Sequence, residues 1–486
     1  MLVSACSLVA GKINKPHREL HGMRHACFSV IALIAVFAEY WLLNYSAFPL
    51  FDPISIVTRE ISAAAGGFVL VLLALVAAWK PSVFKERLFF AGVPVVLIVG
   101  LGLMGVGLSL QASLPLILGV SCITIAIGLI AVVVGIGCIG MPSRTLGLCV
   151  IVAYFLSYVL RGFFQFLPTT LNMIFFALIP LVALALSASY ARPVLAEIFL
   201  AEPPVRAVIT TPNSLLPFEH QIFIVLIVFR FVYGYTLTFG ETERVPFLSF
   251  FALIPLGILV IYAIFRKHPL DLDGLFRMSI LFSIAGFLVL SLSGGPHDII
   301  ASNLLSCGTG FFEILMYISL VALGSKNKQS SLVVLTWGNA MASLGTIVGA
   351  NFGRLTNAYY GSDSIALSVI SATIVFCLVF YVLVIQKDFS FMKTVQSIAP
   401  LAPVVFSTHL VSPETQCIAL SERHGLTPRE SEILMLLARG RNTRFIQDKL
   451  VVSYNTVKTH VSHIYAKLDV HTHQELINLV EEQLPH

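Results

Sequence analysis

The sequence predicts an all-α protein: a polytopic membrane helix bundle of about twelve spans, grouped six and six, followed by a C-terminal four-helix domain with a helix-turn-helix. Apolar residues make up 57% of the 486 residues, charged residues only 11%, and the mean hydropathy is +0.91. A soluble core cannot hide that much apolar surface. Apolar runs long enough to cross about 30 Å of hydrocarbon recur along the chain. They stop near Gln386, where the composition changes.

The apolar runs are expected to be helices, because a membrane-spanning segment must satisfy its own backbone hydrogen bonds. A strand barrel would need alternating runs of about ten residues, whereas these runs are continuous. The expected spans are 25–47, 60–79, 88–110, 113–139, 145–167, 169–190, 219–240, 245–265, 275–293, 299–323, 331–352 and 364–385. The prediction is therefore an N-terminal segment at 1–24 and a membrane region at 25–385.

Lysines and arginines are unevenly distributed between the connections of these spans. If the N-terminus is cytoplasmic, the inner segments carry 15 of them and the outer loops carry only Arg59, Arg244 and Arg354. Basic connections stay on the cytoplasmic side of a bilayer. Both termini are therefore expected in the cytoplasm, with the chain in the cell inner membrane and the lipid bilayer as a partner.

The longest internal connection, residues 191–218, carries five prolines and divides the spans six and six. This arrangement resembles the major facilitator superfamily, in which two six-helix bundles rock around a central cavity. That family usually has a glycine and an Asp-Arg pair in the basic loop between the second and third spans. Here residues 79–87 read Trp-Lys-Pro-Ser-Val-Phe-Lys-Glu-Arg, with neither feature. The resemblance implies the fold, while transport by the family's mechanism is in doubt.

Four ionisable residues lie well inside the predicted spans: Glu39, Arg161, Arg230 and Glu313. Each should face protein or water, because a charge at the bilayer centre costs roughly 2.5–3.5 kcal/mol or more. By sequence depth, Glu39 and Arg161 fall in the outer part of the membrane, and Arg230 and Glu313 fall nearer its middle. In a facilitator-like fold all four helices line the central cavity. Two interpretations stay open: a site for a small polar ligand or a charge-paired gate, and two structural ion pairs between helices.

Residues 386–420 carry three prolines and no sustained periodicity, so they are predicted to be a linker. A soluble helical unit is expected at 421–486. Thr427 and Glu430 have the spacing of a capping box around Pro428, which opens a helix ending at Gly440. Asn442 can cap a short second helix that runs to Leu450.

After a three-residue turn, Ser453 caps a third helix that ends at Leu468. Apolar residues recur along it at intervals of four, three and four, which predicts a buried stripe: Val457, Val461, Ile464 and Leu468. Thr472 and Glu475 repeat the capping-box spacing at the start of a last helix. Four short helices with a tight turn between the middle two predict a helix-turn-helix.

The opposite face of the third helix carries one cation and small side chains that suit a major groove: Asn455, Lys458, Thr459, Ser462 and Ala466. Between Arg439 and Lys467 there are six basic residues and one acid, although 420–486 holds eight of each. Such concentrated positive charge indicates contact with phosphates. The alternative is a solvated basic face with no role in nucleic-acid binding.

Residues 425–434, Gly440 and residues 456–468 strongly resemble the LuxR/FixJ/NarL-type DNA-binding domain. The resemblance implies that Lys458, Thr459 and Ser462 face bases of double-stranded DNA. In that family the third helix is the recognition helix, which enters the major groove. The resemblance places a further set of residues near phosphates or in support of this helix: Asn442, Thr443, Ser453, Thr456, His460 and Lys467. It further implies a homodimer on DNA formed through the last helix, by Leu476, Leu479 and Val480. The chain departs from the family at Gln447, where a small residue is usual, and at His471 and His473, where arginine is frequent.

The two regions together predict a membrane-embedded one-component transcription regulator of a bacterial type. The membrane region would sense an unknown signal, such as a small-molecule ligand, a lipid or the membrane state, and the tail would bind promoter DNA. The alternative is a secondary transporter with a regulatory tail. In a third interpretation the spans act only as an anchor. We expect no enzymatic activity, metal or cofactor, because the sequence shows no residue constellation for one.

Overall fold

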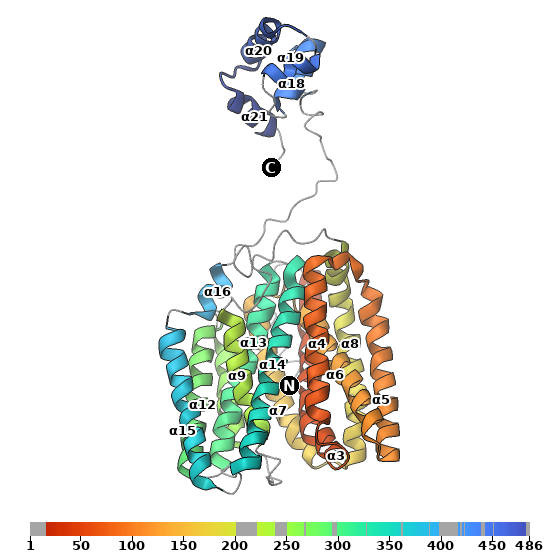
Figure 1. The fold of residues 1–486 in the computed structure, drawn as a ribbon, viewed down its shortest axis with the longest axis vertical. Coiled ribbons are helices and arrows are strands. Elements are labelled where there is room, and N and C mark those ends of the chain that lie inside the picture. Colours follow the sequence, from red (N-terminus) through yellow and green to blue (C-terminus); the bar gives the residue numbers. More distant parts are fainter. Residues whose placement is uncertain are drawn as a thin grey trace. The chain divides into compact units, whose positions relative to one another are not determined.

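The computed structural model describes residues 16–200, 221–238, 250–293, 299–397 and 417–482, with short internal gaps at 267–268, 327, 361–362, 388, 418–419, 422, 439–442 and 451. The chain divides into two compact units, Met1–Pro400 and Leu401–His486. Every regular element in the described ranges is a helix (Figure 1). This confirms the all-α fold class.

The first half of the membrane unit contains the first six expected spans. α2 (Pro16–Leu42) continues through a π-helical turn (Leu43–Ala47) into α3 (Phe48–Phe51). The following helices are α4 (Thr58–Trp79), α5 (Val93–Leu110), α6 (Ser113–Gly137), α7 (Ser143–Gln165) and α8 (Thr169–Leu200). α2 begins before residue 25, and α8 continues past residue 190.

α8 passes through Pro193, although the sequence predicts a connection at 191–218. A proline removes one backbone hydrogen bond from a helix. Apolar side chains beyond it compensate, because Leu195 and Ile198 are fully buried against the bundle. Tertiary burial therefore extends the helix where local propensity would end it.

The second half contains the other six expected spans: α9 (Gln221–Leu237), α11 (Leu253–Phe265), α12 (Leu272–Ser293), α13 (Ile299–Lys326), α14 (Ser331–Tyr360) and α15 (Ser364–Phe380). Within the described ranges, ten helices are long and apolar enough to cross a membrane, and α9 and α11 are shorter apolar helices. Large apolar side chains such as Phe68, Ile258 and Phe376 are exposed on the bundle surface, as lipid contact requires. The chain is a multi-pass membrane protein.

The helix contacts of the two halves follow one repeated pattern. α2 packs on α7 and α9 packs on α14, so the first helix of each half contacts the fifth. Between the halves, α4 packs on α14 and α7 packs on α11. Exchanging the halves interchanges these two contacts, which is the relation expected of two structural repeats related by a pseudo-two-fold axis.

The second unit has the four predicted helices: α18 (Pro428–Ala438), α19 (Thr443–Leu450), α20 (Tyr454–Leu468) and α21 (His473–Glu482). They enclose a hydrophobic core of their own, built largely from Ile433, Leu434, Leu437, Ile446, Val457, Ile464, Leu468 and Leu476. Cys417 and Leu420 also belong to it. The core therefore takes in residues before position 421, the expected start of the domain.

The predicted linker, 386–420, contains a short helix at its beginning. α16 (Phe391–Ser397) packs on α12 and α13 of the membrane unit. Its own seven residues are too few to form a stable helix without help. Contacts with distant parts of the chain supply that help, and for this reason the local sequence pattern did not reveal it.

Close packing of α9 on α14 gives the first prediction. A Cβ on Gly349 would overlap the backbone carbonyl of Phe231, so Gly349→Ala must separate the helices at a cost of about 1–3 kcal/mol. We expect a lower melting temperature for the purified protein in detergent. Gly102→Ala is the control, because a Cβ there meets nothing within 4 Å. Equal melting of the two variants would contradict this packing.

Candidate functional site

The helix-turn-helix is held in place by side-chain caps at its helix ends. The backbone N–H of Glu430 donates to Thr427 Oγ1 at 3.3 Å, and the N–H of Thr427 donates to Glu430 Oε2 at 2.8 Å. The N–H of Thr456 donates to Ser453 Oγ at 3.1 Å, which fixes the start of α20. These caps confirm the predicted capping box and the predicted N-cap.

The start of α21 is capped in a similar way. The N–H of Glu475 donates to Thr472 Oγ1 at 3.1 Å, and the N–H of His471 donates to Glu475 Oε2 at 2.7 Å. Thr472 thus caps α21 as its spacing predicts, while Glu475 accepts the N–H one residue before the cap rather than that of Thr472. The helices of the tail are therefore defined largely by their own sequence.

α20 has one buried face and one exposed face, as its sequence predicts. Val457, Ile464 and Leu468 are buried in the core of the tail. The exposed residues of the helix and its cap include Ser453, Asn455, Thr456, Lys458, Thr459 and Ser462. The structure thus brings the candidate DNA-facing side chains together on the solvent side of one helix.

Lys467 is bonded within the tail. Its Nζ donates to Glu430 Oε2 at 2.8 Å and to the carbonyl oxygen of Gly425 at 3.0 Å. The Lys467 hydrogen bond and the Thr427 N–H lower the pKa of Glu430 to about 2. Lys467 thus ties α20 to α18, which agrees with the expected role of supporting the recognition helix.

The other expected tail residues lie in different environments. Thr443 begins α19 and is half-buried, as is His460. Asn442 lies outside the described residues. Leu476 and Val480 are buried in the core of the tail and Leu479 packs against it. These three side chains are therefore occupied by the fold itself, and a dimer contact through α21 would need its other face.

A cavity of about 160 Å³ lies between the two halves of the membrane unit. The first half contributes aromatic and polar side chains, among them Tyr40, Trp41, Glu60 and Tyr154. The second half contributes Arg230, Tyr233, Thr309, Glu313 and Asn339. Cavities that combine aromatic walls with a few convergent polar groups are typical of small-molecule sites.

Arg230 on α9 and Glu313 on α13 form an ion pair at the cavity wall. Arg230 Nη2 lies 2.9 Å from Glu313 Oε1 and 2.7 Å from Oε2, and both side chains are about 15% exposed. This confirms that two of the four membrane charges meet. The pair is both a contact between helices and part of the cavity surface, so it combines the two interpretations that the sequence left open.

The other two charges do not pair with each other. The guanidinium of Arg161 lies over three aromatic rings, with its Cζ 4.7 Å from the Trp41 centroid, 4.1 Å from Tyr45 and 5.3 Å from Tyr158. Ring faces attract a cation in this geometry. Glu39 is 1% exposed, and its carboxyl oxygens accept no hydrogen bond from the described residues. Neither residue lines the cavity. The four helices that carry these charges all contribute residues to the cavity, as expected, but of the four charges only Arg230 and Glu313 lie on its wall. The alternative of two structural ion pairs therefore holds for one pair among the described residues.

An ion pair that the sequence pattern does not predict joins the two halves. Arg354 Nη1 on α14 lies 2.5 Å from Glu60 Oε1 on α4. Arg59 and Arg354 had been assigned to outer loops, yet both lie within helices and Arg59 is buried. Tyr233 was also missed, although it follows Arg230 by one helical turn on the same span. That spacing is a signal that could have identified it.

Comparisons with known proteins assign both units. Residues 424–480 match the family described as "Bacterial regulatory proteins, luxR family". The "Uncharacterized response regulatory protein YgeK" of Escherichia coli (strain K12) is 43% identical over 74 residues, which cover 14% of this chain and 50% of that protein. The "Transcriptional activator protein ExaE" of Pseudomonas putida is 41% identical over 58 residues, 12% of this chain and 27% of that protein. The chain thus spans half or less of the length of these relatives.

Two solved structures are similar to the membrane unit. A human organic anion transporter, MFSD10 (TETRAN), covers 76% of this chain and 99% of its own, with 14% identity and a TM-score of 0.47. The major facilitator superfamily proton:xylose symporter XylE covers 78% of this chain and 99% of its own, with 9% identity and a TM-score of 0.51. At such low identity the likeness to XylE concerns the fold alone.

The chain is therefore a helical membrane protein with a C-terminal DNA-binding-type domain. More specifically, a LuxR-family helix-turn-helix follows a membrane region with the major facilitator fold. Both resemblances stated from the sequence are confirmed.

The Glu430–Lys467 contact gives the second prediction. Lys467→Met should destabilise the tail by about 1–3 kcal/mol at pH 7, the usual contribution of hydrogen bonds to charged groups. Because the folded pKa of Glu430 lies below its ordinary value of 4.5, this stabilisation is present above pH 4.5 and is lost as the pH falls to about 2. Thermal unfolding of residues 401–486, followed by circular dichroism, should show the two melting temperatures converging over that range.

Lys458→Met is the matched control, because Lys458 is exposed on the same helix and forms no ion pair with the described residues. It should leave the melting temperature almost unchanged. A gap between wild type and Lys467→Met that stays constant from pH 7 to pH 2 would disprove the assignment.

Proposed function

We propose that this chain is a membrane-embedded one-component transcription regulator. The observation that carries the proposal is the exposed face of α20, where Lys458, Thr459 and Ser462 lie opposite the buried stripe. A helix with this division can enter a major groove while its other face holds it to the domain. The match of residues 424–480 to bacterial regulators supports the same conclusion.

DNA recognition would divide between bases and phosphates. The Lys458 ammonium donates hydrogen bonds and suits guanine O6 and N7, while the hydroxyls of Thr459 and Ser462 are short enough to reach base edges. Ser453, Thr456 and the first turn of α19 at Thr443 would lie near the backbone. A homodimer would place two such helices on neighbouring half-sites.

The bilayer would hold the tail on the cytoplasmic side of the inner membrane. The excess of Lys and Arg in the inner connections supports this orientation. Arg59 and Arg354 lie within helices rather than in loops, which leaves even fewer basic residues in the outer connections.

The membrane region would sense a small molecule in the cavity of the Arg230–Glu313 pair. A polar ligand can exchange hydrogen bonds with either charge, while the rings of Tyr40 and Tyr233 contact its apolar part. A ligand changes the conformational equilibrium only if it binds one arrangement of the two halves more tightly than the other. The Glu60–Arg354 pair joins the two halves, so its geometry can differ between such arrangements. A ligand at Arg230 and Glu313 acts on the packing of α9 against α13 within the second half.

The third prediction concerns base recognition. Lys458→Ala should weaken binding of the full-length protein to its operator by about 1–3 kcal/mol, the usual contribution of a direct base contact. Binding to a scrambled duplex should fall much less, because phosphate contacts remain. Competition binding with both duplexes measures the difference. Unchanged discrimination between them would refute the base-facing role of Lys458.

The fourth prediction concerns the cavity. Glu313→Gln leaves Arg230 without its ionic partner and should abolish the response of promoter occupancy to an effective ligand. Genome-wide DNA capture with and without candidate ligands identifies that ligand and measures the response. Glu39→Gln is the matched control, because this buried acid lies outside the cavity. A normal ligand response in the Glu313→Gln variant would exclude the ion pair from sensing.

A secondary transporter with a regulatory tail is the second candidate. The facilitator fold and the charged cavity favour it. Uptake into proteoliposomes that is lost in the Glu313→Gln variant would establish transport. Uptake together with normal ligand-dependent promoter occupancy in a DNA-capture experiment would show that both activities reside in one chain.

A further inference from the structure

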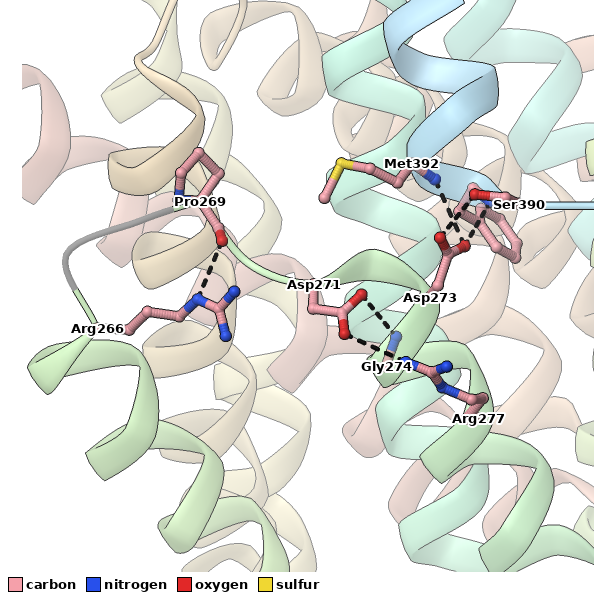
Figure 2. A network of polar contacts seen from close by, with 9 residues as sticks. Arg266, Pro269, Asp271, Asp273, Gly274, Arg277, Ser390 and Met392 are labelled. Carbon is pink, nitrogen blue, oxygen red and sulfur yellow. Dashed lines mark hydrogen bonds and ion pairs between the residues drawn. The ribbon is translucent and has the colours of Figure 1, made fainter.

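The segment that leads from the last membrane helix toward the tail is anchored to the second half of the membrane unit. Figure 2 shows the contact between Asp273, in the first turn of α12, and the start of α16. Ser390 Oγ donates to Asp273 Oδ2 at 2.6 Å, and the N–H of Phe391 donates to Asp273 Oδ1 at 2.7 Å. Ser390 Oγ also accepts the N–H of Lys393 at 3.1 Å. Asp273 therefore orders a helix that lies more than a hundred residues later in the chain.

An aromatic contact completes this anchor. Phe391 is 1% exposed, and its ring centroid lies 5.1 Å from that of Phe276 and 4.9 Å from that of Phe389. Burial of this ring away from water stabilises the contact. We call residues 389–397, held by Asp273 and Phe276, the docked segment.

The neighbouring carboxylate, Asp271, forms a different set of contacts. Asp271 accepts the N–H of Gly274 at 2.9 Å and lies 3.3 Å from Arg277 Nη2, so its contacts stay within the start of α12. Figure 2 shows both acids on the same short stretch of chain. Of the two acids, it is Asp273 that bonds the docked segment.

Packed rings connect the docked segment with the cavity. The Phe276 centroid lies 5.4 Å from that of Phe229, and Phe229 stacks on Phe312 at 4.5 Å. Phe229 precedes Arg230 and Phe312 precedes Glu313 in the sequence. The ion pair and the rings that support Phe276 therefore come from neighbouring positions of α9 and α13. If Arg230 and Glu313 separate by a shift of α9 against α13, the rings of Phe229 and Phe312 on the same two helices shift with them, because packed side chains have little free space.

We propose that the docked segment is the switch through which the cavity controls the tail. With the ion pair closed, Phe276 supports Phe391 and the segment stays on α12. With the ion pair opened, the ring contacts shift, the segment leaves Asp273 and the connection to the tail is lengthened by residues 389–397. This inference rests on the proposed function, and it adds the element that joins sensing to DNA binding.

Hydrogen exchange of the full-length protein in lipid nanodiscs tests whether the segment is docked. Amides of residues 389–397 should be protected in the wild type and should exchange at least tenfold faster in Asp273→Ala and in Phe391→Ala. Asp271→Ala is the matched control and should leave exchange in 389–397 unchanged. Melting temperatures near that of the wild type establish that the variants fold. Equally fast exchange in the wild type and Asp273→Ala would overturn the docking.

The same measurement tests the connection with the cavity. Glu313→Gln opens the ion pair without a ligand and should speed exchange in 389–397 severalfold, whereas Glu39→Gln should not. Faster exchange in Asp273→Ala with none in Glu313→Gln would overturn the coupling.

Promoter occupancy separates failure of the switch from failure of the proposed function. Occupancy measured in cells should change in the same direction in Asp273→Ala and in Glu313→Gln. Normal occupancy in Asp273→Ala, despite faster exchange, would overturn the switch. Absence of promoter binding by the wild type would instead overturn the proposed function, whatever the exchange data show.

Discussion

A charge inside a bilayer must find its compensation within the protein, and this constraint organises the membrane unit. Arg230 and Glu313 compensate each other across two helices at the cavity wall. Arg161 is compensated by aromatic rings instead. Glu60 and Arg354 meet between the two halves. Each solution fixes a pair of helices, so the positions of the charges and the packing of the bundle determine one another.

The tail differs from the membrane unit in this respect, because water hydrates its exposed charges. Its helices are defined by local caps and by a small core built from residues of the tail itself. A domain of this kind can be joined to many sensors, since its recognition face needs no support from them. In this chain the domain follows a membrane unit and the docked segment. These two parts distinguish the chain from other proteins with a domain of this kind.

The spans were predictable from the sequence because membrane insertion depends on the hydropathy of about twenty consecutive residues, which is a local property of the chain. The caps at Thr427, Ser453 and Thr472 were predictable for a similar reason, since each bonds within a few residues. Contacts between distant residues were not predictable. α16 needs Asp273 and Phe276, and the partners of Glu60 and Arg161 depend on how helices pack. The apolar face of α21 could serve a core or a partner, and spacing alone does not distinguish them.

The engagement of Lys467 has a consequence for how the tail would respond to ionic strength. Binding to DNA releases counterions from phosphates, and each neutralised phosphate steepens the loss of affinity with salt. A lysine already bonded to Glu430 releases none unless that bond is broken first. The tail should therefore behave as a less highly charged ligand of DNA than its composition suggests, and its affinity for DNA should fall less steeply as the salt concentration rises.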